Sequence, residues 1–391
     1  MANTNLASKS ILIAAFSGRA LAQSAARAGY RPLVVDCFGD LDMRAAADAW
    51  RCLPARVQVG FLKRPLIDAL DELAEQAPTA PVGLVLGAGF ECNPRLVAAL
   101  AERYSLIGNS ADTIRRVKDP ETFFSTLDTL GIRHPETRRT PPNEAAGWLM
   151  KRVGGSGGLH IHDCPAEPRP DPRRYFQRFE PGEPVSLLGI TSQRGAAFAA
   201  TGQWTNPRPR RRYRYGGAVS GLRIDVDLET VMIDVALDVS KAFQLVGLVS
   251  FDFIVSPEGE PILLEVNPRP GASLDVLDDS AGTLFEAHVT SSVAARAGQS
   301  PATLLQSQWR PPRAKAAAYL YADRSELAAP PLDWPGWAAD RPAAGTKIGR
   351  GQPLATVIAE AETPSEAIHL CRERLGILER LVYDAQIERE P

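Results

Sequence analysis

The sequence lacks the features that would mark a membrane, secreted or nucleic-acid-binding protein. No apolar stretch approaches the ~20 residues that span a bilayer. The run ILIAAF after Lys9, with the small residues beyond it, could open a signal peptide, but its six apolar residues and Arg19 fall short of the usual core. The five cysteines are scattered and odd in number, which argues against a disulfide framework and for a reducing compartment. A net charge of -2 gives no broad field for nucleic acid or an anionic membrane, so we expect a cytoplasmic protein.

Several catalytic signatures are also missing. The chain has no G-x-x-x-x-G-K-[ST] phosphate loop, and no motif surrounds a Ser-His-Asp or Cys-His set. The first turn after a strand reads FSGRA and lacks GxGxxG, so a structural turn is favoured there over a dinucleotide site. A length of 391 residues allows two or three domains with a sizeable core.

The first part of the chain alternates predicted strands and helices. Strands are expected at ILIAAF, RPLVVD, VGLVLGAG and SLIGN, with helices between them and Asn93 as the cap of one helix. This rhythm predicts an α/β fold with a doubly wound parallel sheet. Beyond it we expect helices broken at Pro120, a strand WLMKRV, a strand–turn–strand at YFQRFEPGEPVSLLGI and a helix over 228–245. Linkers are expected at 301–313 and 323–345, then short strands and a last helix at 364–379.

The segment VSFDFIVSPEGEPILLEVN predicts a β-hairpin with acidic side chains on one face. With a two-residue turn at Glu258 and Gly259, Asp252 faces Glu265 at a distance of ~5 Å between side-chain roots. Two carboxylates this close repel unless a proton or a cation lies between them. Asp252, Glu265 and Asn267 form an all-oxygen set that suits Mg²⁺ bound to nucleotide phosphates. The alternative is a solvent-facing hairpin whose wet side happens to be acidic.

Two glycine-rich segments precede the hairpin. The loop after Lys151 reads RVGGSGG, and its freed N–H groups could approach an anion beside the lysine charge. In QRFEPGEPVS, strand-edge backbone could read an adenine, and Glu183 could bind ribose hydroxyls. Each segment alone is also compatible with an ordinary turn.

Taken together, Lys118, Lys151 with its glycine loop, the FEPGE turn and the Asp-x12-Glu-x-Asn hairpin resemble the ATP-grasp superfamily. The resemblance implies a Rossmann-like pre-grasp domain at 1–112 and a grasp domain at 113–300, with a small lobe at 113–180 and a large lobe at 181–300. It also implies a small β-rich module with a final helix at 301–391. LLEVNPRPGASLD is similar to a carboligase group that includes the archaeal tyramine–glutamate ligase of methanofuran synthesis.

The resemblance also implies roles for individual residues. The cofactors would be ATP and Mg²⁺ or Mn²⁺, with two ions bridged by Glu265. Arg269, Lys151 and Arg214 would be catalytic, and Asp252, Glu265 and Asn267 would hold the metal. The nucleotide would be bound by Lys118, Lys151, Gly154, Gly155, Ser156, Gly157, Gly158, the backbone of Arg178 and Glu180, and Glu183.

The implied reaction is an ADP-forming ligation. A carboxylate, with glutamate as the leading candidate, becomes an acyl phosphate and is joined to an amine, in a methanofuran- or methanopterin-type cofactor pathway. Positioning and cationic stabilisation suffice for phosphoryl transfer. The alternatives are a carboxylase- or kinase-like member, or a non-catalytic nucleotide-binding regulator, which Ser250 keeps open because related ligases have an arginine there. A homodimer would be typical of such enzymes, and no nucleic-acid or membrane partner is expected.

Three further features leave alternatives open. The run NPRPRRRYRYGG, with arginines 208, 210, 211, 212 and 214, could be a solvated loop, an RNA-binding segment or a clamp for a multiply anionic substrate. His160, His162 and Cys164 are spaced along a predicted strand, where a zinc or copper site is less favoured than ordinary strand positions. Glu91 follows a strand of the first domain and could contact the acceptor substrate.

Overall fold

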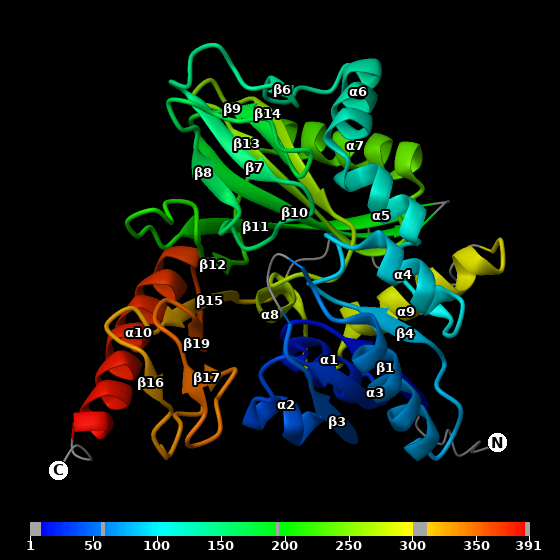
Figure 1. The fold of residues 1–391 in the computed structure, drawn as a ribbon, viewed down its shortest axis with the longest axis vertical. Coiled ribbons are helices and arrows are strands. Elements are labelled where there is room, and N and C mark those ends of the chain that lie inside the picture. Colours follow the sequence, from blue (N-terminus) through cyan, green and yellow to red (C-terminus); the bar gives the residue numbers. More distant parts are fainter. Residues whose placement is uncertain (1–8, 56–58, 193–194, 300–310, 388–391) are drawn as a thin grey trace.

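The N-terminal domain is built on a five-stranded sheet in the order β3-β2-β1-β4-β5, in which every pairing is parallel. The computed structural model describes residues 9–55, 59–192, 195–299 and 311–387. Figure 1 shows this sheet at the lower right, across from the C-terminal strands and helix at the lower left. The strands are β1 Ser10–Ala14, β2 Arg31–Asp36, β3 Ala49–Cys52, β4 Leu84–Leu86 and β5 Leu106–Ile107.

Helices cover both faces of this sheet, as the sequence predicted. Ile11 and Ile13 of β1 pack with α1 on one face, whereas Leu12 and Ala14 pack with α3 and α4 on the other. This alternation follows from the two-residue period of a strand. Asn93 caps α4 by accepting a hydrogen bond from Leu96 N at 3.2 Å. The helices are α1 Arg19–Arg27, α2 Leu41–Ala46, α3 Lys63–Gln76 and α4 Pro94–Ala101.

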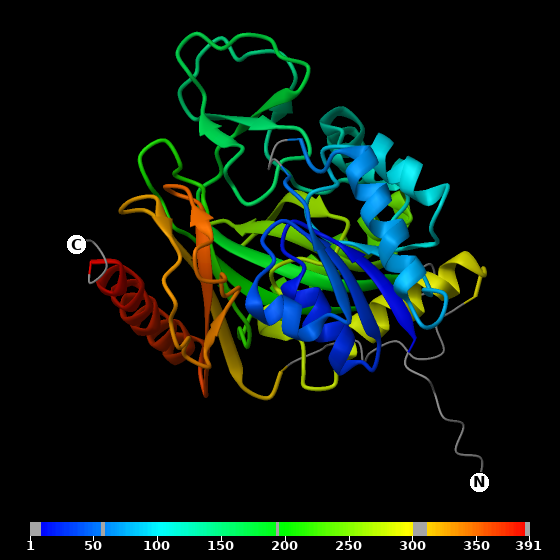
Figure 2. The ribbon, with the colours of Figure 1, turned by 60° about the horizontal axis from the view of Figure 1, so that its bottom comes forward.

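A small lobe follows, with a four-stranded antiparallel sheet in the order β6-β9-β7-β8. The predicted break at Pro120 is present, because Asp119 ends one helix and caps the next. Figure 2 shows the strands and loops of this lobe projecting above the rest of the chain. Its elements are α5 Ala111–Lys118, α6 Pro120–Leu130, β6 Thr137–Arg138, β7 Trp148–Arg152, β8 Ile161–Asp163 and β9 Arg174–Arg178.

The large lobe is an antiparallel sheet whose one face is covered by α6 and α7. Phe251 and Phe253 are at most 1% exposed and pack on these helices, which stabilises the face by ~1.5–3 kcal/mol per aromatic ring. Its elements are β10 Glu183–Ser192, β11 Gly195–Thr205, β12 Tyr215–Val219, α7 Val226–Phe243, β13 Gly247–Val255, β14 Pro261–Asn267, α8 Leu274–Leu277 and α9 Thr283–Arg296.

The C-terminal strands extend this same sheet. Its order is β14-β13-β10-β11-β12-β15-β19-β17, while β16 and β18 form a separate ribbon. The region is β-rich with a final helix, as expected; the boundaries at 112 and 300 remain predictions. The predicted linker at 301–313 lies largely outside the described residues, and the one at 323–345 contains two short strands. The elements are β15 Ala314–Tyr321, β16 Leu327–Ala328, β17 Ala338–Ala339, β18 Lys347–Ile348, β19 Pro353–Ala361 and α10 Pro364–Ile387.

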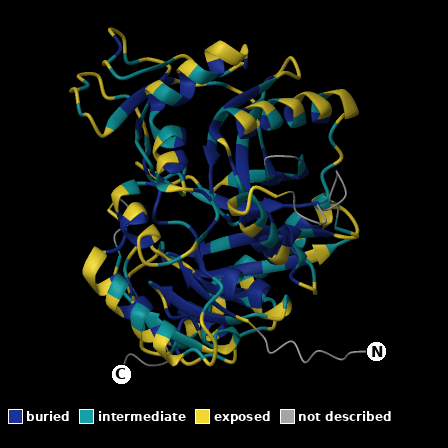
Figure 3. Cartoon of the chain, turned by 90° about the vertical axis from the view of Figure 1, so that its right-hand side faces the viewer, coloured by how far each residue is buried: buried dark blue, intermediate teal, exposed yellow. Residues whose placement is uncertain are grey.

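Buried residues fill the strands of both large sheets, and exposed residues lie on the outer turns of helices and on loops (Figure 3). Within the described ranges, no helix combines the length and apolar character needed to cross a bilayer. The polar residues discussed below are therefore exceptions within an apolar interior. Because burying an unpaired charge is costly, each needs a partner or a ligand.

Candidate functional site

The β13–β14 hairpin brings the predicted acidic residues together. Asp252 lies directly opposite Glu265, and Ser250 lies opposite Asn267. The Asn267 amide joins the carboxylates, since Nδ2 donates to Asp252 Oδ2 at 2.9 Å and to Glu265 Oε1 at 3.2 Å. Ser186 Oγ on the adjacent strand β10 donates to Asp252 Oδ1 at 2.6 Å. The pair is therefore held in place from three strands.

The predicted pairing holds, although the turn differs from the predicted one. Val255 pairs with Pro261, and the loop between them closes by a hydrogen bond from Ser256 N to Glu260 O at 2.9 Å. The turn is therefore longer than two residues, and it alone would set Asp252 out of register with Glu265. A bulge between the pairs of Phe253 and Asp252 restores the register by one residue.

Lys118 supplies the nearest positive charge to this pair. Its Nζ donates to Asn267 Oδ1 at 2.8 Å and lies 4.0 Å from Glu265 Oε2. Burial and the charge of Glu265 raise the pKa of Asp252, which is the expected result for two close carboxylates. Burial opposes ionisation of Glu265, but Lys118, His160 and Lys151 together hold its pKa below the ordinary value.

Lys151 and His160 lie beside the carboxylates from the small-lobe side. Lys151 is buried near the end of β7, and its Nζ donates to Gln177 Oε1 on β9. Burial lowers its pKa, while Glu265 and Asp252 oppose that change. Burial also lowers the pKa of His160 to about 4, so its ring is neutral near pH 7. The charges of both lysines, Lys118 and Lys151, therefore act on Glu265.

The glycine loop Gly154 to Gly158 packs closely against other parts of the chain. A Cβ on Gly154 would lie 2.6 Å from Glu91 O, and one on Gly158 would lie 1.7 Å from Tyr213 O. Gly157 O accepts a hydrogen bond from Tyr215 N at 3.1 Å. The loop therefore contacts both the N-terminal domain and the large lobe, and its close approach at Gly154 and Gly158 excludes any side chain there.

Arg269 lies on the other side of the carboxylates, where it pairs with Glu91. The Nε–Oε1 distance is 2.6 Å, and both side chains are largely buried. Burial would raise the pKa of Glu91, but Arg269 and Lys118 hold it below its usual range. A Cβ on Gly271 would lie 3.0 Å from Arg269 Nη1 and 3.7 Å from Ser250 Oγ. Arg269 thus places a guanidinium near Ser250, the position where the resemblance implied an arginine.

A small cavity adjoins the ion pair. It has a volume of about 20 Å³, room for roughly one water molecule, and its lining includes Asn109, Arg269 and His288. Leu248 N donates to His288 Nδ1 at 2.9 Å, so Nε2 carries the ring hydrogen. Among the described residues, no group accepts that hydrogen. The cavity therefore has a free donor at one wall.

Other predicted residues are not joined to this network. Glu183 is exposed at the first residue of β10, opposite Val255, and Glu180 precedes it in the turn. The N–H of Arg178 donates to Glu136 O at 2.8 Å and so is not available to an adenine ring. The nucleotide roles of these three residues and of Ser156 stay predictions.

Arg214 differs from the predicted arrangement, since its side chain binds Asp323 and not Asp252 or Glu265. It is fully buried, donates to both oxygens of Asp323 at 2.8 Å and stacks 3.8 Å from the centre of the Tyr321 ring. Its remaining contacts are with Asn206. Four of the five N–H donors of this guanidinium are therefore used inside the protein, which does not favour the catalytic role predicted for Arg214.

Three other arginines of the run also have partners inside the chain. Arg208 pairs with Asp323, Arg211 donates to Gly351 O, and Arg212 pairs with Asp163. These contacts make the segment part of the surface that joins the lobes. They do not favour a clamp for a multiply anionic substrate.

His160, His162 and Cys164 do not act as one set. His160 lies in the turn before β8 and is buried, whereas His162 is exposed. Across the described ranges, no cluster of three or more His, Cys, Asp or Glu side chains is placed to hold a metal ion. Sequence reasoning missed three polar strand residues that bind predicted site residues. Ser186 and Gln203 bind Asp252, and Gln177 binds Lys151. A lone hydroxyl or amide on a strand carries no signal of such a contact.

Comparison with known proteins finds a domain family for the middle of the chain. A family model described as an ATP-grasp domain matches residues 117–273. The C-terminal section of a carbamoyl phosphate synthase large chain from Methanopyrus kandleri is 23% identical over 232 residues. That match covers 52% of this chain and 42% of the relative, so the chain spans less than half the length of the relative.

Solved structures share the fold at low sequence identity. The carboxyaminoimidazole ribonucleotide synthase of Aspergillus clavatus, complexed with ATP, has a TM-score of 0.66 at 13% identity, covering 95% of this chain and 99% of its own. The L-amino acid ligase of Bacillus licheniformis has a TM-score of 0.64 at 13% identity, covering 93% and 96%. A biotin carboxylase from Campylobacter jejuni has a TM-score of 0.64 at 15% identity, covering 92% and 89%.

Proposed function

We propose that this chain, which contains an ATP-grasp domain over residues 117–273, is an ATP- and Mg²⁺-dependent ligase that joins a carboxylate to an amine and forms ADP. The observation that carries the proposal is the convergence of two carboxylates, two lysines and an arginine on one partly buried patch. Phosphoryl transfer needs this kind of positioning and charge stabilisation and little covalent help from the protein.

The donor set fits a magnesium ion. Asp252 and Glu265 present carboxylate oxygens on either side of the Asn267 amide, and hard oxygen donors are the ligands that Mg²⁺ prefers. In the present arrangement the amide nitrogen of Asn267 faces the carboxylates, so Asn267 must turn its amide to become a third ligand. A bound ion would neutralise phosphate charge and relieve the repulsion between Asp252 and Glu265.

The side chains of the chain itself then divide into two groups. Lys118, Lys151 and the N–H groups of the glycine loop bind phosphate oxygens and orient the terminal phosphoryl group. Arg269 stabilises the negative charge on the transferring phosphoryl group as the substrate carboxylate bonds to it and the bond to ADP breaks. The neutral ring of His160 closes the site beneath Gly155, where its ring leaves no room for a side chain. Exclusion of water protects an acyl phosphate from hydrolysis until the amine attacks.

Glutamate is the proposed carboxylate, in a methanofuran- or methanopterin-type cofactor pathway. This narrower proposal rests on the similarity of LLEVNPRPGASLD to the carboligase group alone. A carboxylase- or kinase-like reaction uses the same phosphoryl chemistry and differs in the acceptor. Product analysis therefore separates the two reactions.

Nucleotide turnover tests the proposal. The protein is incubated with Mg-ATP, glutamate and a pool of biological amines, and ADP is resolved from AMP by chromatography. ADP that needs both glutamate and an amine supports ligation; AMP would refute the acyl-phosphate route, and ADP formed with bicarbonate but no amine would indicate a carboxylase.

The metal assignment is tested with Glu265→Gln. We expect Mg-ATP affinity to fall at least ~10-fold, because a charged ligand is lost from a buried site. Glu258→Gln is the matched control, since Glu258 lies exposed in the turn of the same hairpin. Equal affinity in both variants would exclude Glu265 as a metal ligand.

A further inference from the structure

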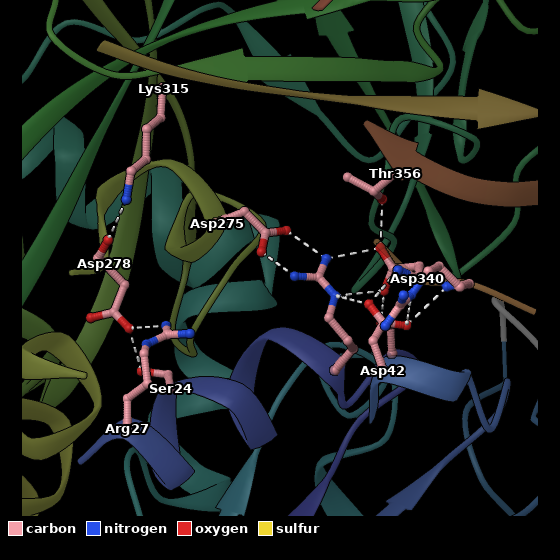
Figure 4. Close-up of polar contacts among 11 residues, drawn as sticks. Ser24, Arg27, Asp42, Asp275, Asp278, Lys315, Asp340 and Thr356 are labelled. Carbon is pink, nitrogen blue, oxygen red and sulfur yellow. Dashed lines mark hydrogen bonds and ion pairs between the residues drawn. The ribbon is translucent and has the colours of Figure 1, made fainter. Parts of the chain in front are cut away.

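A second cluster of buried carboxylates lies where three parts of the chain meet. Arg19 at the start of α1 donates to Asp275 on α8 at 2.8 Å and to Asp340 in the C-terminal region at 2.9 and 3.0 Å. Asp42 lies 3.9 Å from the same guanidinium. Figure 4 shows Asp275 on one side of the cluster, with Asp42 and Asp340 on the other.

The cluster has more negative charge than its cations balance. Its carboxylates are Asp36, Asp40, Asp42, Asp275 and Asp340. The negative charges of Asp340, Asp36 and Asp42 act on the carboxylate of Asp40. Arg19 is surrounded by these groups, while Arg341 reaches only the outer side of Asp42 at 3.8 Å. Burial and the neighbouring aspartates raise the pKa of Asp40, so this carboxylate requires a proton or a cation.

Asp40 is the member of the cluster whose hydrogen bonding is incomplete. It is 4% exposed, and its Oδ2 has no partner among the described residues. Asp278, which Figure 4 labels beside Ser24 and Arg27, shows the contrast, since it is equally buried but accepts from Ser24, Arg27 and Leu284 N. An unpartnered carboxylate oxygen inside a negatively charged cluster is a place for a ligand that donates hydrogen bonds and carries positive charge.

Charges from both sites act on one tyrosine. Burial raises the pKa of Tyr215, and the charges of Tyr319, of Asp275 in the cluster and of Asp252 in the proposed phosphoryl-transfer site raise it further. The Tyr215 and Tyr319 rings lie 5.4 Å apart, and Asp340 and Asp275 act on Tyr319. Ser17, which is exposed and donates to Asp340 at 3.1 Å, marks the side that faces solvent.

We propose that this cluster binds the ammonium group of the amine substrate, with Asp40 as its main acceptor. A primary ammonium has three donors and no acceptor, which matches carboxylates that only accept. The inference rests on the proposed ligase function, because only that reaction requires an amine. It assigns a binding role to residues of the N-terminal and C-terminal regions that lie outside residues 117–273.

Equilibrium binding tests the proposal without nucleotide. Putrescine is titrated against the full chain, and butanediol, which has hydroxyls in place of the ammonium groups, is titrated in parallel. We expect saturable binding of putrescine only, and a Kd raised at least ~10-fold in Asp40→Asn, which removes the charge of one acceptor. Asp238→Asn is the matched control, because Asp238 lies exposed on α7 and should leave the Kd unchanged.

A second variant keeps the test decisive if Asp40→Asn fails to fold. Ser17→Arg adds a cation at an exposed position beside Asp340 and should also weaken putrescine binding at least ~10-fold by repulsion. Equal Kd values in the unaltered protein and either folded variant, or equal binding of butanediol, would overturn the proposal. So would binding of Mg²⁺ at the cluster with none of putrescine, which would mark an inorganic cation site. If the unaltered protein bound putrescine but not Mg-ATP, the ligase function would be refuted and the ammonium site would stand.

Discussion

Glu91→Gln should lower the free energy of unfolding by about 3–5 kcal/mol, because it removes the hydrogen-bonded counter-charge of the buried Arg269 guanidinium. The two side chains are 3% and 13% exposed and meet at 2.6 Å, so water screens the pair poorly. The other carboxylate oxygen of Glu91 accepts from Gly89 N at 3.0 Å and Phe90 N at 3.1 Å. A glutamine keeps one acceptor but loses the charge that both N–H groups and Arg269 favour.

Urea unfolding, followed by tryptophan fluorescence, measures this effect in a double-mutant cycle of Glu91→Gln and Arg269→Gln. A direct contact predicts a coupling energy of about 1–3 kcal/mol. Glu72→Gln is the control, because the Arg51–Glu72 pair is exposed and should contribute at most ~1 kcal/mol. A coupling below ~0.5 kcal/mol would refute the view that this pair ties the N-terminal domain to the site.

The same pair has a predictable pH dependence. The folded-state pKa of Glu91 lies below its unfolded value, chiefly because Arg269 and then Lys118 outweigh the effect of burial. Its contribution is therefore fully present above the unfolded pKa of ~4.3 and is lost as pH falls through the folded pKa. The unfolding free energy of Glu91→Gln should fall less steeply on acidification below pH ~4.3 than that of the unaltered protein.

Two further variants test the loop and Arg214. Gly158→Ala should reduce Mg-ATP affinity at least ~10-fold, because its Cβ would lie 1.7 Å from Tyr213 O. Gly157→Ala is the control: it has the same left-handed backbone, but its Cβ meets nothing within 4 Å, so it should cost only ~1–2 kcal/mol of strain. Equal Mg-ATP affinities of the two variants would show that the loop does not close on Tyr213. Arg214→Met should lower the unfolding free energy by about 3–5 kcal/mol and leave Mg-ATP affinity unchanged. Arg208→Gln is the control, because Arg208 pairs with the same Asp323 from the exposed side and its loss should cost at most ~1 kcal/mol of unfolding free energy. A large loss of Mg-ATP affinity in Arg214→Met would return this residue to the site.

The carboxylate hairpin was predictable because strand alternation is a local property. Residues two apart share a face, so Glu265 and Asn267 had to lie together, and the apolar residues between them fixed which face is buried. The bulge at Leu264 was not predictable, because nothing in PILLEVN distinguishes a bulged residue from a paired one. The predicted pairing survived because the longer turn and the bulge offset each other.

Contacts between distant segments were beyond the sequence. The arginine run gave no sign that Arg214 would be buried and Arg208 exposed, since their shared partner Asp323 is more than a hundred residues away. In the same way, β15 and β19 were expected in a separate module, yet they pair into the sheet of the large lobe. Alternation predicts what each strand buries, but not which edge it joins.

The geometry of the loop from Asn267 to Asp275 explains why a proposed metal ligand and the acidic cluster lie so close in sequence. Arg269 binds Glu91 in the turn after β4, and Asp275 binds Arg19 just after β1. These two strands are neighbours, and the helices that follow them lie on opposite faces of the sheet. That point of divergence is where open α/β sheets bind ligands beyond their carboxyl ends. The N-terminal domain thus contacts the loop that carries Asn267 at two points, one on each side of the crevice at the carboxyl ends of its strands. A substrate that displaces either ion pair there must also shift Asn267, so acceptor binding and nucleotide binding should be coupled through this loop.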